Sequence, residues 1–342
     1  MEKIKKYEPS LQSFSGIAII FVVFIHANSY YLLSVLKKTS YEEVYFTTRL
    51  LDNFIHGAVP MFIFISGYKY ILNDINKSYK EYSIRRIKRV IKPFLIISMI
   101  FFLKDIVVNY KSLNIKIDIT NFLKIFIGYN IAYQLWYIPM YIFISLTYPI
   151  IYKLLKNEKI RILFILFIVV IQYYVSWHSE LIASHPFDFI YYYIFFEMGV
   201  IFYKYDIVYK FKKYNVLIIA IYVALAFIVT LNPLNEIVGH LKKFMLWPMS
   251  VVAYYFLNSK IQDNKLLQYL GENSFYIFLL HEPIICTQLS YLFKSLGIYN
   301  FVGYVFIIAI LTIIITLMFY NGYMHLKNSI LNFFNLTLRR NR

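Results

Sequence analysis

Long apolar runs, interrupted only by short polar segments, follow one another from one end of the chain to the other. A run of about 20 apolar residues crosses the hydrocarbon core of a bilayer as one helix, whose backbone hydrogen bonds are all internal. The pattern predicts an all-α, polytopic integral membrane protein of about ten transmembrane helices, folded as a single domain over residues 1–342. We expect the helices near residues 14–34, 52–72, 91–109, 134–154, 160–176, 187–204, 214–231, 243–258, 267–288 and 299–321.

Lysine and arginine residues are distributed unevenly over the segments between these runs. If the N-terminus is cytoplasmic, most of the cations fall in the inner segments, and the densest group lies in residues 74–92. An excess of positive charge on the inner side is the rule for membrane proteins, and an even number of spans returns the chain to the side where it began. The charge pattern therefore predicts that both termini are cytoplasmic.

Composition and charge narrow the class of protein further. The chain is 60% hydrophobic and 20% aromatic, and its net charge is +17. The cations lie in short clusters beside apolar runs, as in loops next to an anionic leaflet, so we expect a lipid bilayer and no nucleic acid as the partner. The sequence has no nucleotide-binding glycine loop, no metal-spaced Cys and His set and no Gly-x-Ser-x-Gly motif, which predicts no metal and no bound cofactor.

A few ionisable side chains are expected inside the predicted spans, where burial of a charge is costly: His26, Lys69, Glu197, and His281 with Glu282 beside it. The two histidines are predicted at similar depths in helices that run in the same direction, so their imidazoles could converge, and one could deprotonate a hydroxyl group. The alternative is that each histidine makes a helix-to-helix hydrogen bond. Lys69 lies near a helix end and could extend to the interface, whereas Glu197 is too deep for that and needs a partner.

A basic cluster precedes the third predicted helix. On a helix, Arg85 and Arg89 are i,i+4 neighbours and Arg86 and Arg89 are i,i+3 neighbours. This spacing could grip the several phosphates of a nucleotide-like ligand. A cluster that only sets the topology or binds lipid is the alternative interpretation.

Several short motifs occur in order along the chain. They are LQSFSGIA at 11–18 followed by His26, VPMFIFISGY at 59–68, RIKR at 86–89 with Pro93, LWYIP at 135–139, and LGENSFYIFLLH at 270–281. In order, spacing and ten-span setting, this set resembles the acyltransferase-3 family of bacterial membrane proteins, which O-acylate cell-surface glycans and other acceptors. The resemblance spans most of the chain.

The resemblance implies roles for residues of these motifs. His26 would be the catalytic base, and Arg86 and Arg89, with Arg85 beside them, would bind acyl-coenzyme A (acyl-CoA) as the donor substrate, while the acceptor approaches from outside. His281 is the second catalytic candidate because of its predicted depth. Four further residues are expected to line the cavity: Ser66, Lys69, Trp136 and Glu197.

Two regions depart from the family pattern. The family usually has Asp and Arg where this chain has Gln12 and Ser15, and often has a histidine where this chain has Gln134. Three interpretations of the missing arginine stay open. The donor or acceptor could be divergent, another cation such as Lys69 could replace the arginine, or catalysis could be lost.

Taken together, the sequence predicts a membrane O-acyltransferase of the bacterial cytoplasmic membrane, an enzyme that transfers groups other than aminoacyl groups. It would move an acyl group, with acetyl the expected one, from cytoplasmic acyl-CoA to a hydroxyl of an extracytoplasmic glycan or another envelope acceptor. One alternative is an exporter of a polysaccharide or lipid-linked sugar without acyl transfer. Another is a scaffold subunit of the envelope-polymer synthesis machinery.

Overall fold

The computed structural model describes residues 9–35, 41–109, 133–177, 188–232 and 236–340. These residues are helical almost throughout, and no strand occurs among them, so the predicted all-α class is confirmed. Five helical stretches of the described chain are long and apolar enough to cross a membrane: Ser10–Val35, Val44–Asp74, Gln134–Leu154, Tyr209–Leu231 and Val302–Lys327. The total of about ten spans and the cytoplasmic side of both termini stay predictions.

Every predicted span falls largely on helical backbone. The long helices are α1 (Pro9–Val35), α2 (Tyr41–Ile55), α3 (Ala58–Lys69), α4 (Tyr79–Asn109), α6 (Tyr137–Leu154), α7 (Glu158–Trp177), α8 (Asp188–Tyr205), α10 (Asn215–Leu231), α12 (Trp247–Ile261) and α16 (Ile307–Arg340). The shorter ones are α9 (Ile207–Phe211), α11 (Glu236–Leu241), α13 (Lys265–Glu272), α14 (Ser274–Leu280) and α15 (Cys286–Ser295). Short 3-10 segments lie at Tyr133–Trp136 and Lys212–Tyr214, and π segments at Tyr70–Asp74, Lys242–Leu246, His281–Ile285 and Val302–Phe306.

The span predicted at 267–288 is not one continuous helix. Helix α14 ends at Leu280, and Glu282 has an extended backbone with φ −135° and ψ 142°. Pro283 follows it, and a proline both lacks the N–H that a helix needs and disfavours the helical conformation in the residue before it. The interruption places two polar side chains, His281 and Glu282, at an irregular turn inside an apolar segment.

The span predicted at 52–72 is also interrupted. Helix α2 ends at Ile55, and α3 begins at Ala58 after a turn at His56 and Gly57. Pro60 then lies in the first turn of α3, where a missing N–H removes no intrahelical hydrogen bond. This interruption places another polar residue, His56, at an irregular position within an otherwise apolar stretch.

Glycines allow two pairs of helices to approach backbone to backbone. A Cβ atom at Gly16 would lie 2.1 Å from a carbonyl oxygen of α13, and one at Gly271 would lie 1.8 Å from a carbonyl oxygen of α1. Gly67 and Gly199 join α3 and α8 in the same way, with distances of 1.9 and 2.1 Å. Small residues at helix contacts are typical of membrane proteins, where close van der Waals packing drives association. Gly16, Gly67 and Gly271 all belong to the sequence motifs.

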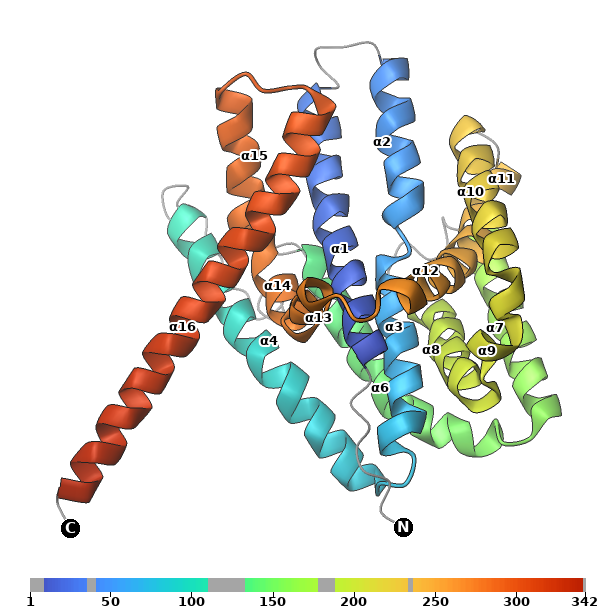
Figure 1. The fold of residues 1–342 in the computed structure, drawn as a ribbon, viewed down its shortest axis with the longest axis horizontal. Helices are drawn as coiled ribbons and strands as arrows, with labels where there is room; N and C mark the ends of the chain where they lie inside the picture. The colour runs from blue at the N-terminus through green and yellow to red at the C-terminus, as the bar shows by residue number, and fades with distance from the viewer. Residues whose placement is uncertain (1–8, 36–40, 110–132, 178–187, 233–235, 341–342) are drawn as a thin grey trace.

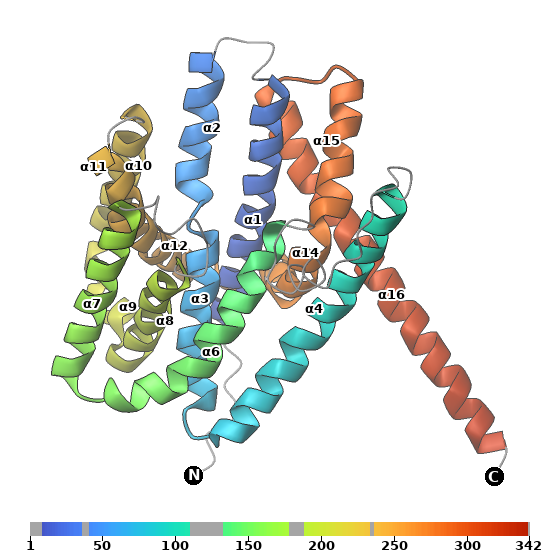
Figure 2. The same cartoon turned by 180° about the vertical axis from the view of Figure 1, so that it is seen from behind.

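The pairs α1–α13 and α3–α8 lie near the centre of the molecule. Figures 1 and 2 show α1, α2 and α3 next to one another there, with α15 and α16 on one flank and α7, α8, α10 and α12 on the other. The C-terminal part of α16 extends away from the remaining helices (Figure 1). Helix α1 contacts both flanks, and α3 contacts α8 and α12 on the second one.

Candidate active site

The imidazole rings of His26 and His281 lie next to each other. His26 is on α1, and His281 begins the irregular turn after α14. The ring centroids are 5.0 Å apart and the ring planes are inclined by 65°. His281 is fully buried, whereas His26 is partly exposed. The structure thus brings together two residues from opposite ends of the chain that the sequence placed at similar depth.

The backbone fixes the protonation pattern of His281. Its Nδ1 atom is 2.8 Å from the carbonyl oxygen of Phe278 and 3.1 Å from that of Ile277. Because a carbonyl oxygen can only accept, Nδ1 carries the proton, and Nε2 of the neutral ring is left with a lone pair. Nε2 is buried without a hydrogen-bond partner in the described chain. An unsatisfied buried acceptor costs about 1–3 kcal/mol, which indicates a functional use for this atom.

A second polar contact lies one helical turn from His26. The hydroxyl of Tyr30 on α1 donates to the carboxylate of Glu282, and the hydroxyl of Thr287 on α15 donates to the same carboxylate at 2.9 Å. The amide of Gln134 donates to the backbone carbonyl of Glu282. Tyr30 therefore joins the interrupted helix to α1, Gln134 joins it to the segment before α6, and Thr287 fixes the carboxylate from within the same helix.

A cavity of about 320 Å³ opens between α1, α3, α4, α6, α13 and α14. Its charged lining residues are the three cations Lys69, Arg86 and Arg89 and one carboxylate, Glu272, so that cations outnumber the acid. Hydroxyl and amide groups come from Gln12, Ser15, Ser66 and Ser274, and aromatic walls from Phe62, Tyr137, Tyr141, Phe275 and Phe278. This set suits an anionic ligand with an apolar part. Among the described residues, no group of three or more His, Cys, Asp or Glu side chains could hold a metal ion.

Phe278 lies between this cavity and the imidazole pair. Its ring centroid is 5.3 Å from that of Tyr137 in the cavity wall and 6.0 Å from that of His281. The two histidines are not among the residues that line the cavity. Phe278 therefore connects the wall of the cavity with the imidazole pair.

The structure divides the predicted arginine cluster. Arg86 and Arg89 line the cavity, and Arg86 donates to the hydroxyl of Tyr141. Arg85 instead pairs with Asp74 and lies outside the cavity lining, with 41% of its side chain exposed. Asp74 also accepts hydrogen bonds from Lys77 at 2.6 Å and Arg86 at 3.4 Å. Arg85 thus lies outside the cavity lining, although it shares Asp74 with Arg86 and lines an open surface pocket together with Arg89.

Lys69 and Ser66 lie where the sequence placed them, in the cavity wall on α3. The hydroxyl of Ser66 donates to the carbonyl of Phe62 at 3.0 Å. Lys69 shares the cavity with Gln12 and Ser15, the two positions that depart from the family pattern. A lysine is therefore present in the same cavity as the serine that replaces the family arginine.

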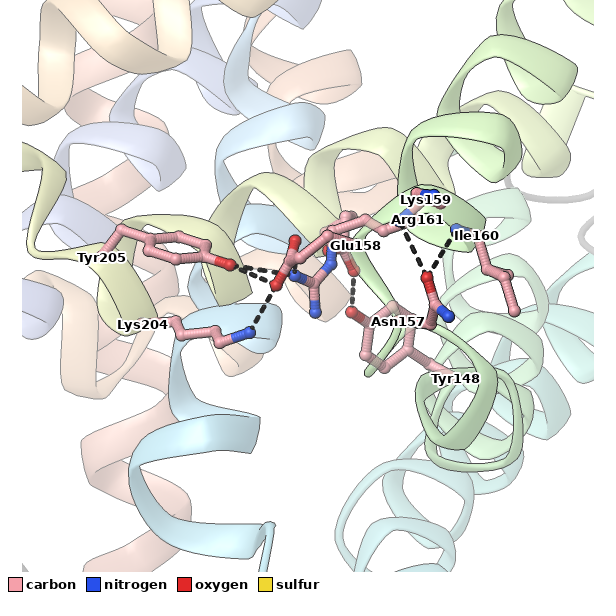
Figure 3. Close-up of polar contacts among 9 residues, drawn as sticks. Tyr148, Asn157, Glu158, Lys159, Ile160, Arg161, Lys204 and Tyr205 are labelled. Atoms are coloured by element: carbon pink, nitrogen blue, oxygen red, sulfur yellow. Dashed lines mark hydrogen bonds and ion pairs between the residues drawn. The ribbon is translucent and has the colours of Figure 1, made fainter.

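Trp136 and Glu197 are not among the residues that line this cavity. The Trp136 ring lies 6.0 Å from that of Tyr192. Glu197 is fully buried and pairs with Nε of Arg161 at 2.7 Å, and the hydroxyl of Tyr148 donates to its carboxylate. Figure 3 shows Arg161 and Tyr148 in this polar cluster. Glu197 thus has the ion-pair partner that its depth required, and a contribution of Glu197 or Trp136 to ligand binding stays a prediction.

Sequence reasoning missed several residues of the site. Tyr30 and Tyr141 bind functional candidates directly, yet two tyrosines have no distinguishing signal in a chain with 35 of them. Glu282 was noticed beside His281 but received no role. Its signal was Pro283, which predicts an irregular backbone at the preceding residue.

Similarity to a known protein family agrees with this geometry. The family model for the acyltransferase domain of the acyltransferase-3 family matches residues 10–321, which is nearly the whole chain. No curated protein and no solved structure matches the chain. The matched range contains both histidines, the cavity and every sequence motif that carried the resemblance. The chain therefore belongs to the acyltransferase-3 family and is an acyltransferase that transfers groups other than aminoacyl groups.

Proposed function

We propose that the protein transfers an acyl group, with acetyl the expected one, from cytoplasmic acyl-CoA to a hydroxyl of an extracytoplasmic glycan or another envelope acceptor. Its proposed location is the bacterial cytoplasmic membrane. The observation that carries the proposal is a cation-lined cavity whose wall includes Phe278, the ring of which lies beside that of His281 in the imidazole pair. The cavity supplies a place for the donor, and the imidazoles supply a base.

The cationic lining of the cavity supports a phosphorylated donor. Arginine forms paired hydrogen bonds with phosphate oxygens, and lysine adds a point charge. Arg86 is already held by Tyr141, so less side-chain freedom is lost when a ligand binds. Arg89 lines the cavity and is also exposed, which leaves room for the nucleotide end of the donor outside.

The length of the path to His26 supports an extended donor arm. Gln12 and Ser15 line the cavity and precede His26 by three to four helical turns on the same helix, which corresponds to roughly 16–21 Å at ~1.5 Å per residue. The pantetheine arm of CoA is a flexible chain suited to such a path. Aromatic side chains and Ser66 along the wall provide the mixed surface that this arm requires.

The imidazole pair suits general base catalysis of acyl transfer. His26 takes the proton of the acceptor hydroxyl while the hydroxyl oxygen forms a bond to the thioester carbon. The carbon–sulfur bond then breaks, and the proton passes from His26 to the departing thiolate, which gives an ester and free CoA. Nε2 of His281 accepts an N–H of His26 in this scheme and so selects the nitrogen of His26 that acts as the base.

The direct test is thiol release from acetyl-CoA by protein purified in detergent, with and without an extract of envelope glycans. The wild type should release thiol faster when the extract is present, and His26→Ala should abolish the stimulation. His325→Ala is the matched control because His325 is exposed on α16, outside the site. Unchanged stimulation in His26→Ala would contradict the assigned base. Absence of donor turnover in the wild type with acetyl or succinyl donors would contradict the proposed function.

A further inference from the structure

A second polar cluster lies at the turn between α2 and α3. The carboxylate of Asp52 accepts from Nδ1 of His56 at 2.9 Å and from Nζ of Lys242 at 2.8 Å. The ring of His56 stacks on that of Trp247, with centroids 5.2 Å apart and planes inclined by 21°. The indole N–H of Trp247 is buried and has no hydrogen-bond partner within the described part of the chain. None of these four residues lines the cation-lined cavity.

The exposure of the cluster indicates that it faces water. Asp52 and His56 belong to the stretch Val44–Asp74, which is apolar and long enough to span a membrane. Yet the side chains of Asp52, His56 and Lys242 are 27, 37 and 24% exposed. Charged groups in contact with lipid are costly, and those that persist within spans line water-filled paths or substrate sites. The cluster therefore borders an aqueous space at the level of the membrane helices.

The register of α1 against α2 places this cluster level with the catalytic candidate. The amide of Asn28 donates to the backbone carbonyl of Thr48 at 2.8 Å, and the two helices run in opposite directions. His26 precedes Asn28 by half a turn, and Asp52 follows Thr48 by one turn, so they lie at a similar depth. The cation-lined cavity, in contrast, extends from Phe278 toward the N-terminal end of α1.

We propose that Asp52, His56, Lys242 and Trp247 form the binding site for the acceptor, and that the acceptor is a neutral, hydroxyl-rich sugar. This inference rests on the proposed function, because it assigns the second substrate of the same reaction. It places the acceptor at the depth of His26 and the donor in the cavity nearer the N-terminal end of α1, so that the two substrates can meet at this histidine.

The chemistry of the cluster selects the class of acceptor. The negative charge of Asp52 is balanced by Lys242, so the site has no net cation with which to attract a phosphate or carboxylate. Its carboxylate and imidazole can accept hydrogen bonds from hydroxyl groups, and the indole N–H of Trp247 can donate one. The ring of His56 covers one face of Trp247, and the part of the indole that His56 leaves open adds an apolar surface against which a sugar ring can pack.

The first test measures thiol release from acetyl-CoA while the methyl glycosides of glucose, galactose and N-acetylglucosamine are varied separately. At least one should stimulate release by the wild type. Asp52→Asn, His56→Gln and Trp247→Phe should each raise the KM for that sugar about tenfold or more, since each loses one hydrogen bond, and should leave the KM for acetyl-CoA unchanged. His325→Gln, on the exposed part of α16, is the matched control.

The outcomes separate this inference from the function on which it rests. If the envelope extract stimulates release but none of the three glycosides does, the proposed acceptor class is overturned. If a glycoside acts and its KM is the same in His56→Gln and Asp52→Asn, the site is overturned while the enzyme activity stands. If the wild type never consumes the donor, the function itself fails, and the second test still decides on the site.

The second test needs no turnover. A thiol introduced by His56→Cys in a Cys286→Ser background should react with a membrane-impermeant maleimide added from the outer side of intact cells. A thiol introduced by Ser66→Cys, in the cation-lined cavity, should not react under the same conditions. Labelling of the His56 position only from the cytoplasmic side, or from neither side, would overturn the placement of the acceptor site.

Discussion

Tyr30 and Glu282 are joined by a hydrogen bond from the phenol to the carboxylate, one helical turn from the contact between His26 and His281. These two contacts connect α1 to the interrupted helix at neighbouring levels. The first holds the position of the turn, and the second forms the proposed catalytic pair. In this turn, Glu282 thus has a structural role, whereas His281 belongs to the proposed catalytic pair.

Removal of the Tyr30 hydroxyl should therefore lower catalysis without weakening donor binding. In Tyr30→Phe, the carboxylate of Glu282 loses one donor and the turn that carries His281 is less firmly held. We expect a lower kcat, an unchanged KM for acetyl-CoA, and a loss of stability of about 1–3 kcal/mol. Thiol-release kinetics and thermal unfolding in detergent measure these effects. A rise in donor KM with unchanged kcat would contradict the positioning role.

Substitutions of His281 can show which of its nitrogens matters. A glutamine places an amide oxygen near the position of Nε2, whereas an asparagine places its amide near Nδ1. If the lone pair of Nε2 orients His26, His281→Gln should keep part of the activity and His281→Asn should lose it by about 10²–10⁴-fold, the usual contribution of general base catalysis. Equal activity of the two variants would exclude this role for Nε2.

The arginines of α4 should differ in their effect on the donor. Arg86→Gln and Arg89→Gln each remove a cation from the cavity and should raise the KM for acetyl-CoA about tenfold or more, because hydrogen bonds to charged groups contribute about 1.5–3 kcal/mol. Arg85→Gln should have a much smaller effect on this KM, since Arg85 is bound to Asp74. Lys92→Gln, an exposed cation one turn further along α4, is the control. Equal KM values in all four variants would place the donor elsewhere.

Glu197 and Arg161 should act on stability and not on donor binding. Glu197→Ala removes one of the two carboxylate partners of the buried Arg161, which keeps its ion pair with Glu158, so the protein should lose about 1.5–3 kcal/mol of stability. The double variant Glu197→Leu with Arg161→Met should recover part of that loss because the buried guanidinium is removed together with its partner. Thermal unfolding of the single and double variants measures the coupling. A raised donor KM in a stable Glu197 variant would return this residue to the cavity.

The carboxylate of Glu158 predicts a dependence of stability on acid. Hydrogen bonds from Tyr205, Lys204 and Arg161, visible in Figure 3, lower the pKa of Glu158 from 4.5 to about 2. Because the lowered value belongs to the folded state, the contribution is fully present above pH 4.5 and is lost as the pH falls through about 2. The difference in melting temperature between wild type and Glu158→Gln should shrink over that interval. A constant difference would contradict these hydrogen bonds.

The existence of the helices followed from the sequence, but their interruptions did not. Apolar runs mark buried helical segments whatever their internal geometry, because every face of such a segment is apolar and no periodicity shows where it bends. Pro283 and the pair Gly57 and Pro60 were visible signals of a break. Whether such residues bend, interrupt or merely begin a helix depends on contacts with distant segments, such as the one between α3 and α12 at Gly57.

The residues of the candidate site that stand out by their depth in the membrane or by their charge could be predicted from the sequence. His26 and His281 were paired by their distance from helix ends, and Arg86 and Arg89 by their spacing. The rotation of α4 about its axis places Arg86 in the cavity wall and leaves Arg85 outside it. The sequence carries no signal of that rotation, because cations lie on every side of this helical turn. Long-range pairs such as Glu197 with Arg161 were hidden for the same reason.

The glycine contacts between α1 and α13 limit how the enzyme can be re-engineered. Where two backbones are in contact, there is no side chain that a smaller one could replace to enlarge the cavity. Substitutions at these glycines can therefore only push the two helices apart. A protein engineer seeking a catalyst for bulkier acyl groups should leave Gly16 and Gly271 alone. The room has to come from the aromatic wall, where replacing Phe62 or Phe275 by alanine enlarges the space without moving a helix.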